Sequence, residues 1–108
     1  LLKIRKALRD ALPPEAFIVK LADRMTRGLP DLLAIAVNDG GELCVMAFEV
    51  KTVSGRLSEI QGETLLRINR AGRKSTRGKC GFWVVHDIAE TMAALRLTGF
   101  CKSGVNRC

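Results

Sequence analysis

Residues 28–51 read GLPDLLAIAVNDGGELCVMAFEVK, and this stretch decides the fold. Two apolar runs flank the turn sequence Asn38-Asp39-Gly40-Gly41, which predicts a β-hairpin. The second run, residues 43–51, is apolar at both sets of alternate positions. That pattern is typical of a central strand that is covered on both faces.

The two apolar runs end in charged residues that the hairpin would bring together. If the strands pair symmetrically about Gly40, the expected pairs are Val37 with Leu43, Ile35 with Val45, Leu33 with Ala47 and Asp31 with Glu49. Opposite residues have Cβ atoms roughly 4.5–5.5 Å apart, and alternation places Lys51 on the same face as Glu49. A slip by one residue would put the two acids on opposite faces.

Two carboxylates at one end of an apolar surface predict a metal site, because like charges repel unless a cation lies between them. Oxygen ligands from Asp31 and Glu49 suit Mg²⁺ or Mn²⁺. Such an ion polarises a phosphoryl oxygen and acidifies a bound water, which Lys51 could orient. The backbone carbonyl of Val50 is a further candidate ligand. The alternative is a plain ion pair, either Glu49 with Lys51 or Asp31 with an arginine.

A polar residue in the next predicted helix can reach the same corner. Ser58 and Gln61 form a capping-box pattern, and the helix is expected to extend to about Ala71 and to stop at Gly72. Gln61 lies on the inner stripe of this helix, one turn from the connection that leaves Lys51. The alternative is that Gln61 only closes the capping box, and the two roles can coexist.

The remaining elements complete an α-β-β-β-α-β-α order. Helical spacing over residues 1–12 ends at Pro13-Pro14, residues 17–21 and 80–86 are predicted strands, and residues 88–97 a helix. Asp87 and Glu90 form a capping pair for that last helix, and the only histidine, His86, is expected to be structural. The 108 residues then form a single α/β domain, a mixed sheet flanked by helices on both faces. Residues 100–108 are left unassigned.

The net charge of +7 is concentrated in the second half of the chain. Residues 52–108 hold 10 basic residues against 4 acidic ones, and residues 1–51 hold 8 against 7. A basic run without acids contains Arg67, Arg70, Arg73, Lys74, Arg77 and Lys79, and the loop before the hairpin adds Arg24 and Arg27. Such an excess indicates a polyanion partner, although a solvated surface is the alternative. Combined with the acidic pair, it favours nucleic acid.

Other sequence classes are disfavoured. No apolar run approaches the roughly 20 residues that span a bilayer, and no signal-peptide pattern is present. The four cysteines match no zinc pattern, and Cys44 and Cys80 fall within apolar runs. We therefore expect reduced cysteines and a cytoplasmic protein with no membrane partner.

Several motifs together resemble one nuclease superfamily. They are Gly28-Leu29-Pro30-Asp31, then Phe48-Glu49-Val50-Lys51-Thr52, then Gly55-Arg56-Leu57-Ser58 leading into Gln61. This series is similar to the PD-(D/E)XK nucleases, and most of all to the virus-type replication-repair nuclease (VRR-NUC) domain, itself similar to archaeal Holliday-junction resolvases. The resemblance covers about residues 17–97 and implies the αβββαβ core of restriction endonucleases.

The resemblance implies Mg²⁺- or Mn²⁺-dependent hydrolysis of DNA phosphodiesters in replication or repair. Asp31 and Glu49 would be metal ligands, Lys51 the catalytic lysine and Gln61 an accessory site residue. Small stand-alone members of the family tend to act as homodimers on branched DNA such as Holliday junctions. A sequence-reading restriction enzyme would need an inserted recognition segment, for which 108 residues leave little room.

One feature departs from the family pattern. An acidic residue on the first helix usually contributes to the metal site, and residues 1–12 offer only Asp10. That ligand could be Asp10, Glu15 or a residue upstream of Leu1, or it could be absent. Its absence would favour the alternative function, a catalytically weak or inactive nucleic-acid-binding module with the same fold.

Overall fold

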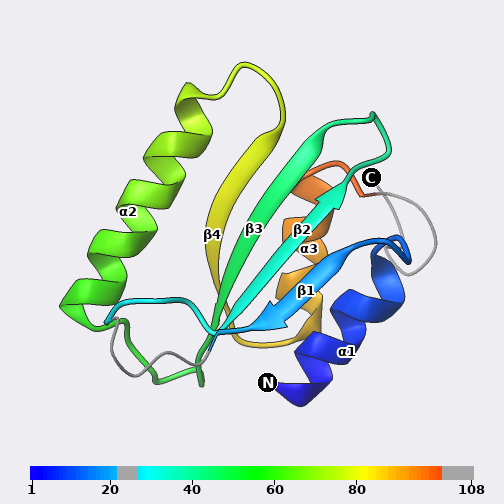
Figure 1. The fold of residues 1–108 in the computed structure, drawn as a ribbon. Coiled ribbons are helices and arrows are strands. Elements are labelled where there is room, and N and C mark those ends of the chain that lie inside the picture. The colour runs from blue at the N-terminus through cyan, green and yellow to red at the C-terminus, as the bar shows by residue number, and fades with distance from the viewer. Residues whose placement is uncertain (22–26, 101–108) are drawn as a thin grey trace.

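A four-stranded sheet organises the chain in the computed structural model, which describes residues 1–21 and 27–100 (Figure 1). The strands are β1 (Phe17–Lys20), β2 (Leu32–Val37), β3 (Leu43–Val50) and β4 (Lys79–Val85), in that spatial order. The first three are antiparallel, whereas β4 is parallel to β3. The helices are α1 (Leu2–Ala11), α2 (Glu59–Lys74) and α3 (Ile88–Leu97). The predicted α/β class, element order and mixed sheet are confirmed.

The hairpin has the predicted register. Val37 pairs with Leu43, and the ladder continues as far as the pair Leu32–Phe48, one residue short of Asp31. The turn is fixed by Asn38, whose Oδ1 accepts hydrogen bonds from two backbone N–H groups of the turn. Asn38 Nδ2 also donates to Thr98 O over 2.8 Å, which attaches the turn to the end of α3.

The hydrophobic core lies on the face of the sheet that α1 and α3 cover (Figure 1). It contains Leu32 of β2, Phe48 of β3, Leu8 of α1 and Leu95 of α3, all fully buried. Phe100, which the sequence left unassigned, belongs to the same core. The helical spacing of residues 1–12 is confirmed, and Ile4, Leu8 and Leu12 all belong to this core.

The helix α2 lies along β4, at one edge of the sheet (Figure 1). Asn69 of α2 accepts a hydrogen bond from Phe82 N over 2.9 Å and donates one to Phe82 O over 3.3 Å. No residue of α2 is buried, so its contact with the sheet is shallow. Within residues 1–21 and 27–100, the face of β1–β3 on this side carries no helix. Coverage of the second face is thus narrower than predicted.

The predicted end of α2 at Gly72 was wrong, because the helix continues to Lys74. Gly72 does not have a positive φ. A Cβ at this position would overlap the carbonyl oxygen of Cys80 in β4. The glycine therefore permits close packing of the helix on the strand edge. Gly99, by contrast, has a φ of 93° and follows α3.

Within the described residues, Cys44 and Cys80 are free thiols, as expected. Burial raises the pKa of both thiols above the ordinary value, which favours their unreactive protonated form. Cys101 and Cys108 lie outside the described residues. No helix in the described part of the chain combines the length and apolarity that crossing a membrane requires.

Candidate active site

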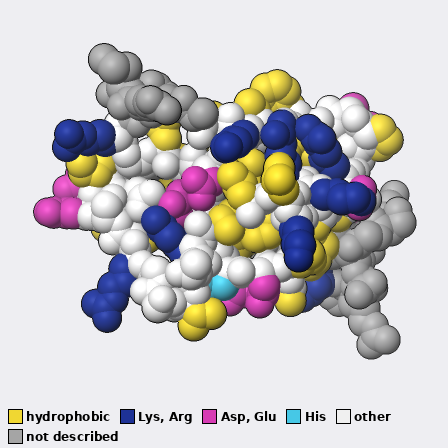
Figure 2. All heavy atoms as spheres, turned by 90° about the horizontal axis from the view of Figure 1, so that it is seen from below, with side chains coloured by type: hydrophobic (Ala, Val, Ile, Leu, Met, Phe, Trp, Pro, Cys, Tyr) yellow, Lys and Arg dark blue, Asp and Glu magenta, His cyan; other side chains and the backbone are white. Residues whose placement is uncertain are grey.

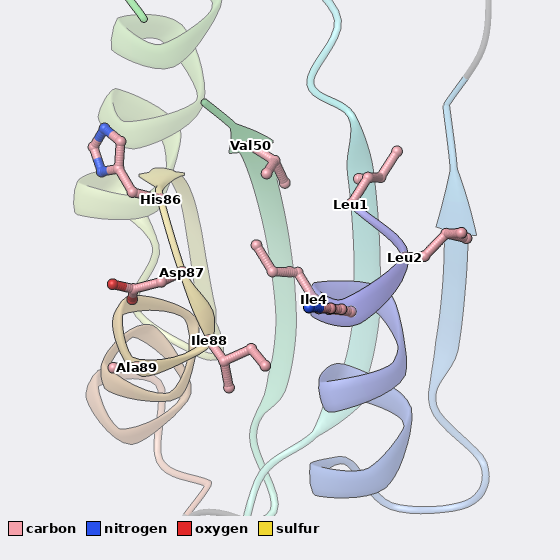
Figure 3. Close-up of a pocket in the computed structure, with 9 residues that line it drawn as sticks. Leu1, Leu2, Ile4, Val50, His86, Asp87, Ile88 and Ala89 are labelled. Carbon is pink, nitrogen blue, oxygen red and sulfur yellow. The ribbon is translucent and has the colours of Figure 1, made fainter. Parts of the chain in front are cut away.

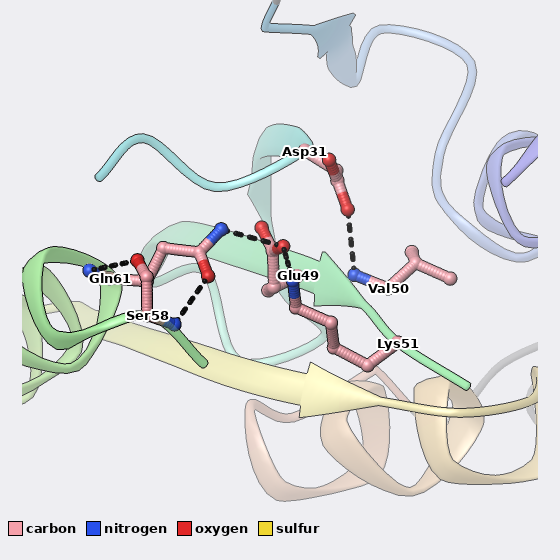
Figure 4. Close-up of polar contacts among 6 residues, drawn as sticks. All are labelled: Asp31, Glu49, Val50, Lys51, Ser58 and Gln61. Atoms are coloured by element: carbon pink, nitrogen blue, oxygen red, sulfur yellow. Dashed lines mark hydrogen bonds and ion pairs between the residues drawn. The ribbon is translucent and has the colours of Figure 1, made fainter. Parts of the chain in front are cut away.

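The candidate site lies where β3 ends and α2 begins (Figure 4). Glu49 is 3% exposed, and its Oε2 accepts a hydrogen bond from Gln61 Nε2 over 2.8 Å. Gln61 Oε1 accepts from Ser58 N over 3.0 Å, and Ser58 Oγ accepts from Gln61 N over 3.2 Å. The capping box and the contact with Glu49 therefore coexist, because each uses a different end of the Gln61 amide.

Lys51 contacts the same oxygen of Glu49. Its Nζ lies 3.1 Å from Glu49 Oε2, and the side chains of Lys51 and Glu49 are 24% and 4% exposed. This is the ion pair that the sequence offered as an alternative to a metal site. The other oxygen, Glu49 Oε1, is buried without a hydrogen-bond partner in residues 1–21 and 27–100. A buried carboxylate oxygen of this kind is costly unless a cation or a donor approaches it.

Asp31 lies just before β2 and points toward the end of β3 (Figure 4). Its Oδ2 accepts a hydrogen bond from Val50 N over 2.9 Å, and its backbone oxygen accepts one from Leu21 N. The ladder between β2 and β3 stops one pair before Asp31 would face Glu49. Asp31 is instead held close to Glu49 by its hydrogen bond to the backbone of the next residue, Val50. A metal-ligand role for the Val50 carbonyl stays a prediction.

The glycine of the Gly28-Leu29-Pro30-Asp31 motif has a structural role that the sequence did not reveal. Gly28 has a φ of 82°, which favours glycine. A Cβ there would come within 2.5 Å of Ile60 Cγ2 and 2.7 Å of Thr64 Oγ1. The loop before Asp31 therefore lies directly against the first turns of α2, which joins Asp31 to the helix that carries Gln61.

A third acidic ligand is missing from this corner in the described residues. No group of three or more His, Cys, Asp or Glu side chains occurs in residues 1–21 and 27–100 that could hold a metal ion. Asp10 is paired with Lys6 over 2.8 Å. With Glu15, Asp10 lines a hollow beside Val37. That end of β2 is about 20 Å from Asp31 at the usual rise of a strand. Asp10 and Glu15 are thus excluded as ligands.

The two carboxylates nevertheless fit a divalent cation. Glu49 Oε1 is free of described partners, and the second oxygen of Asp31 accepts no hydrogen bond from the described part of the chain. Carboxylate oxygens with water in the remaining positions are the usual ligands of Mg²⁺ and Mn²⁺. The first turn of α1 lies near the end of β3, since Ile4 and Val50 line the same hollow. This turn contains no acid that could serve as a third ligand.

The predicted DNA-binding residues do not gather at this corner. Arg27 is exposed at the start of the loop that reaches Asp31, and Arg24 lies outside the described residues. The basic run is exposed along α2 and the following loop, and leads away from the corner to the far end of β4: Arg67, Arg70, Arg73, Lys74, Arg77 and Lys79.

Further basic residues, which the sequence did not propose as DNA ligands, belong to α1. Figure 2 looks onto the end of the sheet where β3 finishes, and shows acidic side chains flanked by many Lys and Arg side chains. Most of these lie toward the side of α1, which carries Lys3, Arg5, Lys6 and Arg9. The alternation of basic and apolar residues over 1–12 could have indicated this second basic surface.

A hollow of about 820 Å³ lies on the other side of β3, between the starts of α1 and α3 (Figure 3). Its lining is mainly apolar and includes Ile4, Val50 and Ile88. His86 borders it, and its Nδ1 lies 2.8 Å from Glu90 Oε1. This pairing at the start of α3 supports the structural role expected for His86. Asp31, Glu49 and Lys51 do not line this hollow, so the candidate chemistry belongs to the opposite face.

The likeness to known structures matches this geometry. A solved structure described as a VRR_NUC domain superposes on 87% of this chain and 91% of its own, with a TM-score of 0.59 and 19% sequence identity. The chain has the fold of a VRR_NUC domain. The predicted resemblance is thus confirmed for the fold. No protein-family model matches the sequence, and no curated protein sequence matches it.

Within the VRR_NUC fold, the motif residues of the sequence fall at one corner. Asp31, Glu49, Lys51 and Gln61 come from the start of β2, the end of β3 and the first turn of α2. At 19% identity the likeness establishes the arrangement of elements, and the chemistry has to be argued from these side chains.

Proposed function

We propose that this protein is a metal-dependent endonuclease that hydrolyses phosphodiester bonds in DNA. The observation that carries the proposal is the environment of Glu49. Gln61 and Lys51 hold one oxygen of its carboxylate, and the buried second oxygen has no partner in the described residues. A purely structural carboxylate would normally have both oxygens hydrogen-bonded. With Asp31 nearby, the free oxygen suits a cation.

Each side chain has a distinct role in this proposal. A divalent cation bound to Asp31 and Glu49 would supply Lewis-acid polarisation of a phosphoryl oxygen and a more acidic water. Gln61 orients the Glu49 carboxylate, and Val50 N–H orients that of Asp31. The Lys51 ammonium, at the partly exposed edge of the corner, binds a phosphate oxygen and offsets the negative charge that develops there.

The expected substrate is DNA with a branched structure, such as a four-way junction. The exposed basic residues on α2 and its following loop support a polyanion partner, because they offer contacts to the phosphate backbone without reading bases. The VRR_NUC fold supports the nuclease assignment by analogy of fold alone.

A substrate panel tests the function directly. The purified protein is incubated with a four-way junction, a flap and a linear duplex, each with Mg²⁺, Mn²⁺ or EDTA. We expect cleavage only with metal, strongest on a branched substrate, and lost in Lys51→Ala and Glu49→Gln. Cleavage that persists in EDTA, or that Lys51→Ala leaves intact, contradicts the mechanism.

One observation favours the second candidate, a nucleic-acid-binding module without catalysis. It is the lack of a third acidic side chain beside Asp31 and Glu49 in residues 1–21 and 27–100. This module would bind the same substrates with strong salt dependence and cleave none of them with either metal. Binding and cleavage measured on the same panel therefore separate the two functions.

We further infer that the protein acts as a homodimer, which would present two sites to two strands. Phe17, Val37 and Leu43 are 57%, 47% and 55% exposed on the sheet face opposite α1 and α3, over β1–β3, where no described helix lies. Apolar residues that share one open face are typical of a protein interface. Sedimentation of Leu43→Lys is expected to give a monomer. The control Leu66→Lys, changed at an exposed site on α2, is expected to remain dimeric.

A further inference from the structure

A shallow cavity of about 390 Å³ lies along β4 from its first residue to Trp83, between the last turns of α2 and α3. Its lining combines cations, an indole and apolar groups: Arg73, Lys79, Gly81, Trp83, Leu97 and Thr98. The volume falls in the lower part of the range for small-ligand sites, about 300–1,000 Å³. It is suited to a ligand the size of one nucleotide.

Strand alternation explains how the cation and the indole come together. Lys79, Gly81 and Trp83 occupy every second position of β4 and therefore share one face of the strand. Gly81 has no side chain, and the six-membered ring of Trp83 occupies the space above it. A Cβ on Gly81 would come within 2.5 Å of Trp83 Cη2. The indole is thus directed along the strand toward Lys79.

Trp83 is held in this position by the core. Its ring stacks on that of Phe48, with centroids 5.8 Å apart and an angle of 28° between the planes. The indole is nevertheless only partly buried and lines the cavity. Within residues 1–21 and 27–100, its N–H donates to no acceptor. A half-exposed ring that is fixed on one side provides a rigid surface for stacking, with an unused donor at its edge.

The cations of the cavity are also unpaired. Arg73 and Lys79 are exposed and form no ion pair within residues 1–21 and 27–100. Two free positive charges beside an aromatic ring favour a ligand that carries both a negative charge and a planar ring. A nucleotide has this combination, because the base stacks on an aromatic face while the phosphate meets the cations.

We propose that this cavity binds one unpaired base of a nucleic acid strand, stacked on Trp83, with the neighbouring phosphate on Lys79 and Arg73. The proposal rests on the proposed function, and deepens it by requiring unpaired nucleotides near the cleavage site. Along β4 the cavity extends from Lys79, which pairs with Cys44, to Trp83, one residue before the partner of Glu49, Val84. The phosphate position at Lys79 is therefore about 17 Å along the strand from Val84, and the indole of Trp83 lies between the two.

The single tryptophan of the sequence makes the test direct. The protein is titrated in EDTA, where no cleavage is expected, with single-stranded oligothymidylate and with an abasic oligomer of equal length and charge. We expect oligothymidylate to quench Trp83 fluorescence and to bind at least about fivefold more tightly than the abasic oligomer. Equal affinity of the two oligomers, or binding that leaves the fluorescence unchanged, overturns the proposal.

Variants separate the stacking from the charge. Gly81→Ala displaces the indole and is expected to weaken binding of oligothymidylate alone. The double variant Arg73→Gln/Lys79→Gln is expected to weaken the binding of both oligomers. It should also reduce the slope of log affinity against log salt concentration by about 1.4. Arg9→Gln, on α1, serves as the charge control and should leave the base preference unchanged. Should Gly81→Ala fail to fold, the comparison of the two oligomers with the unmodified protein decides the question.

This measurement is independent of catalysis. If oligothymidylate quenches Trp83 fluorescence but no substrate is cleaved with Mg²⁺ or Mn²⁺, the proposed endonuclease activity is refuted and the base site is retained. Cleavage that Lys51→Ala abolishes, without base-dependent quenching, refutes the base site and retains the endonuclease.

Discussion

Gln61 donates a hydrogen bond of 2.8 Å to Glu49 while its other amide atom caps the helix that carries it. The position of the Glu49 carboxylate is therefore tied to the first turn of α2. Ser58 shares only the capping role of Gln61. Variants of the two residues therefore distinguish the loss of the helix cap from the loss of the carboxylate's orientation.

We expect Gln61→Ala and Ser58→Ala to destabilise the protein to a similar extent, about 0.5–2 kcal/mol, because each removes part of the cap. Urea unfolding measures this free energy. Only Gln61→Ala should also reduce cleavage, by about tenfold or more, since it releases Glu49. Equal cleavage by the two variants would show that Gln61 is no more than a cap.

Glu49→Gln should abolish the binding of Mn²⁺, measured by calorimetry, because an amide oxygen is a far weaker ligand than a carboxylate. Cleavage should fall by about 100-fold or more, consistent with several kcal/mol supplied by a bound cation. The matched control is Glu59→Gln, in the first turn of α2, whose side chain is exposed to solvent. Full Mn²⁺ binding by Glu49→Gln would refute the metal site.

Gly28 and Gly41 permit a matched test, because both have a φ of 82°. Alanine at Gly41 meets open space and should cost only the backbone strain, about 1–2 kcal/mol. Alanine at Gly28 also collides with Ile60 and Thr64. Thermal unfolding should therefore show a larger loss for Gly28→Ala, and only this variant should lose cleavage, since the loop carries Asp31. The prediction fails if Gly41→Ala is the more damaging of the two.

Glu90 contributes a pH-dependent part of the stability. The backbone N–H of His86, followed by its imidazole, lowers the pKa of the Glu90 carboxyl below its ordinary value of 4.5. A lowered folded-state pKa stabilises the protein above the unfolded value, and this contribution disappears as the pH falls through the folded value.

The free energy of unfolding should therefore decrease on acidification below about pH 4.5, and less steeply in Glu90→Gln. Chemical unfolding at a series of pH values measures the slope. Glu63→Gln, on the exposed side of α2, is the control. An unchanged slope in Glu90→Gln would show that the hydrogen bonds of His86 do not couple folding to protonation.

The sequence predicted the elements with strong local signals. The alternating pattern and the Asn38-Asp39-Gly40-Gly41 turn determine the hairpin register, and the capping residues Ser58 and Asp87 determine where two helices begin. These signals are local, because each depends on residues within a few positions of one another.

Interactions between distant segments could not be predicted in this way. Gly72 has the local pattern of a helix end, yet it serves the contact with Cys80, and the role of Gly28 depends on Ile60. The same limit applied to the site. Alternation placed Lys51 beside Glu49, but the N–H group that holds Asp31 and the distance of Asp10 from the corner depend on the assembled sheet.

The two hydrogen bonds between Asn69 and Phe82 also affect how the molecule behaves in concentrated solution. β4 is an edge strand, and an unpaired edge can add a strand from another chain and so begin aggregation. The Asn69 amide occupies a donor and an acceptor that such a strand would need. One side chain of α2 therefore closes the sheet edge to strand addition at that point, without a fifth strand.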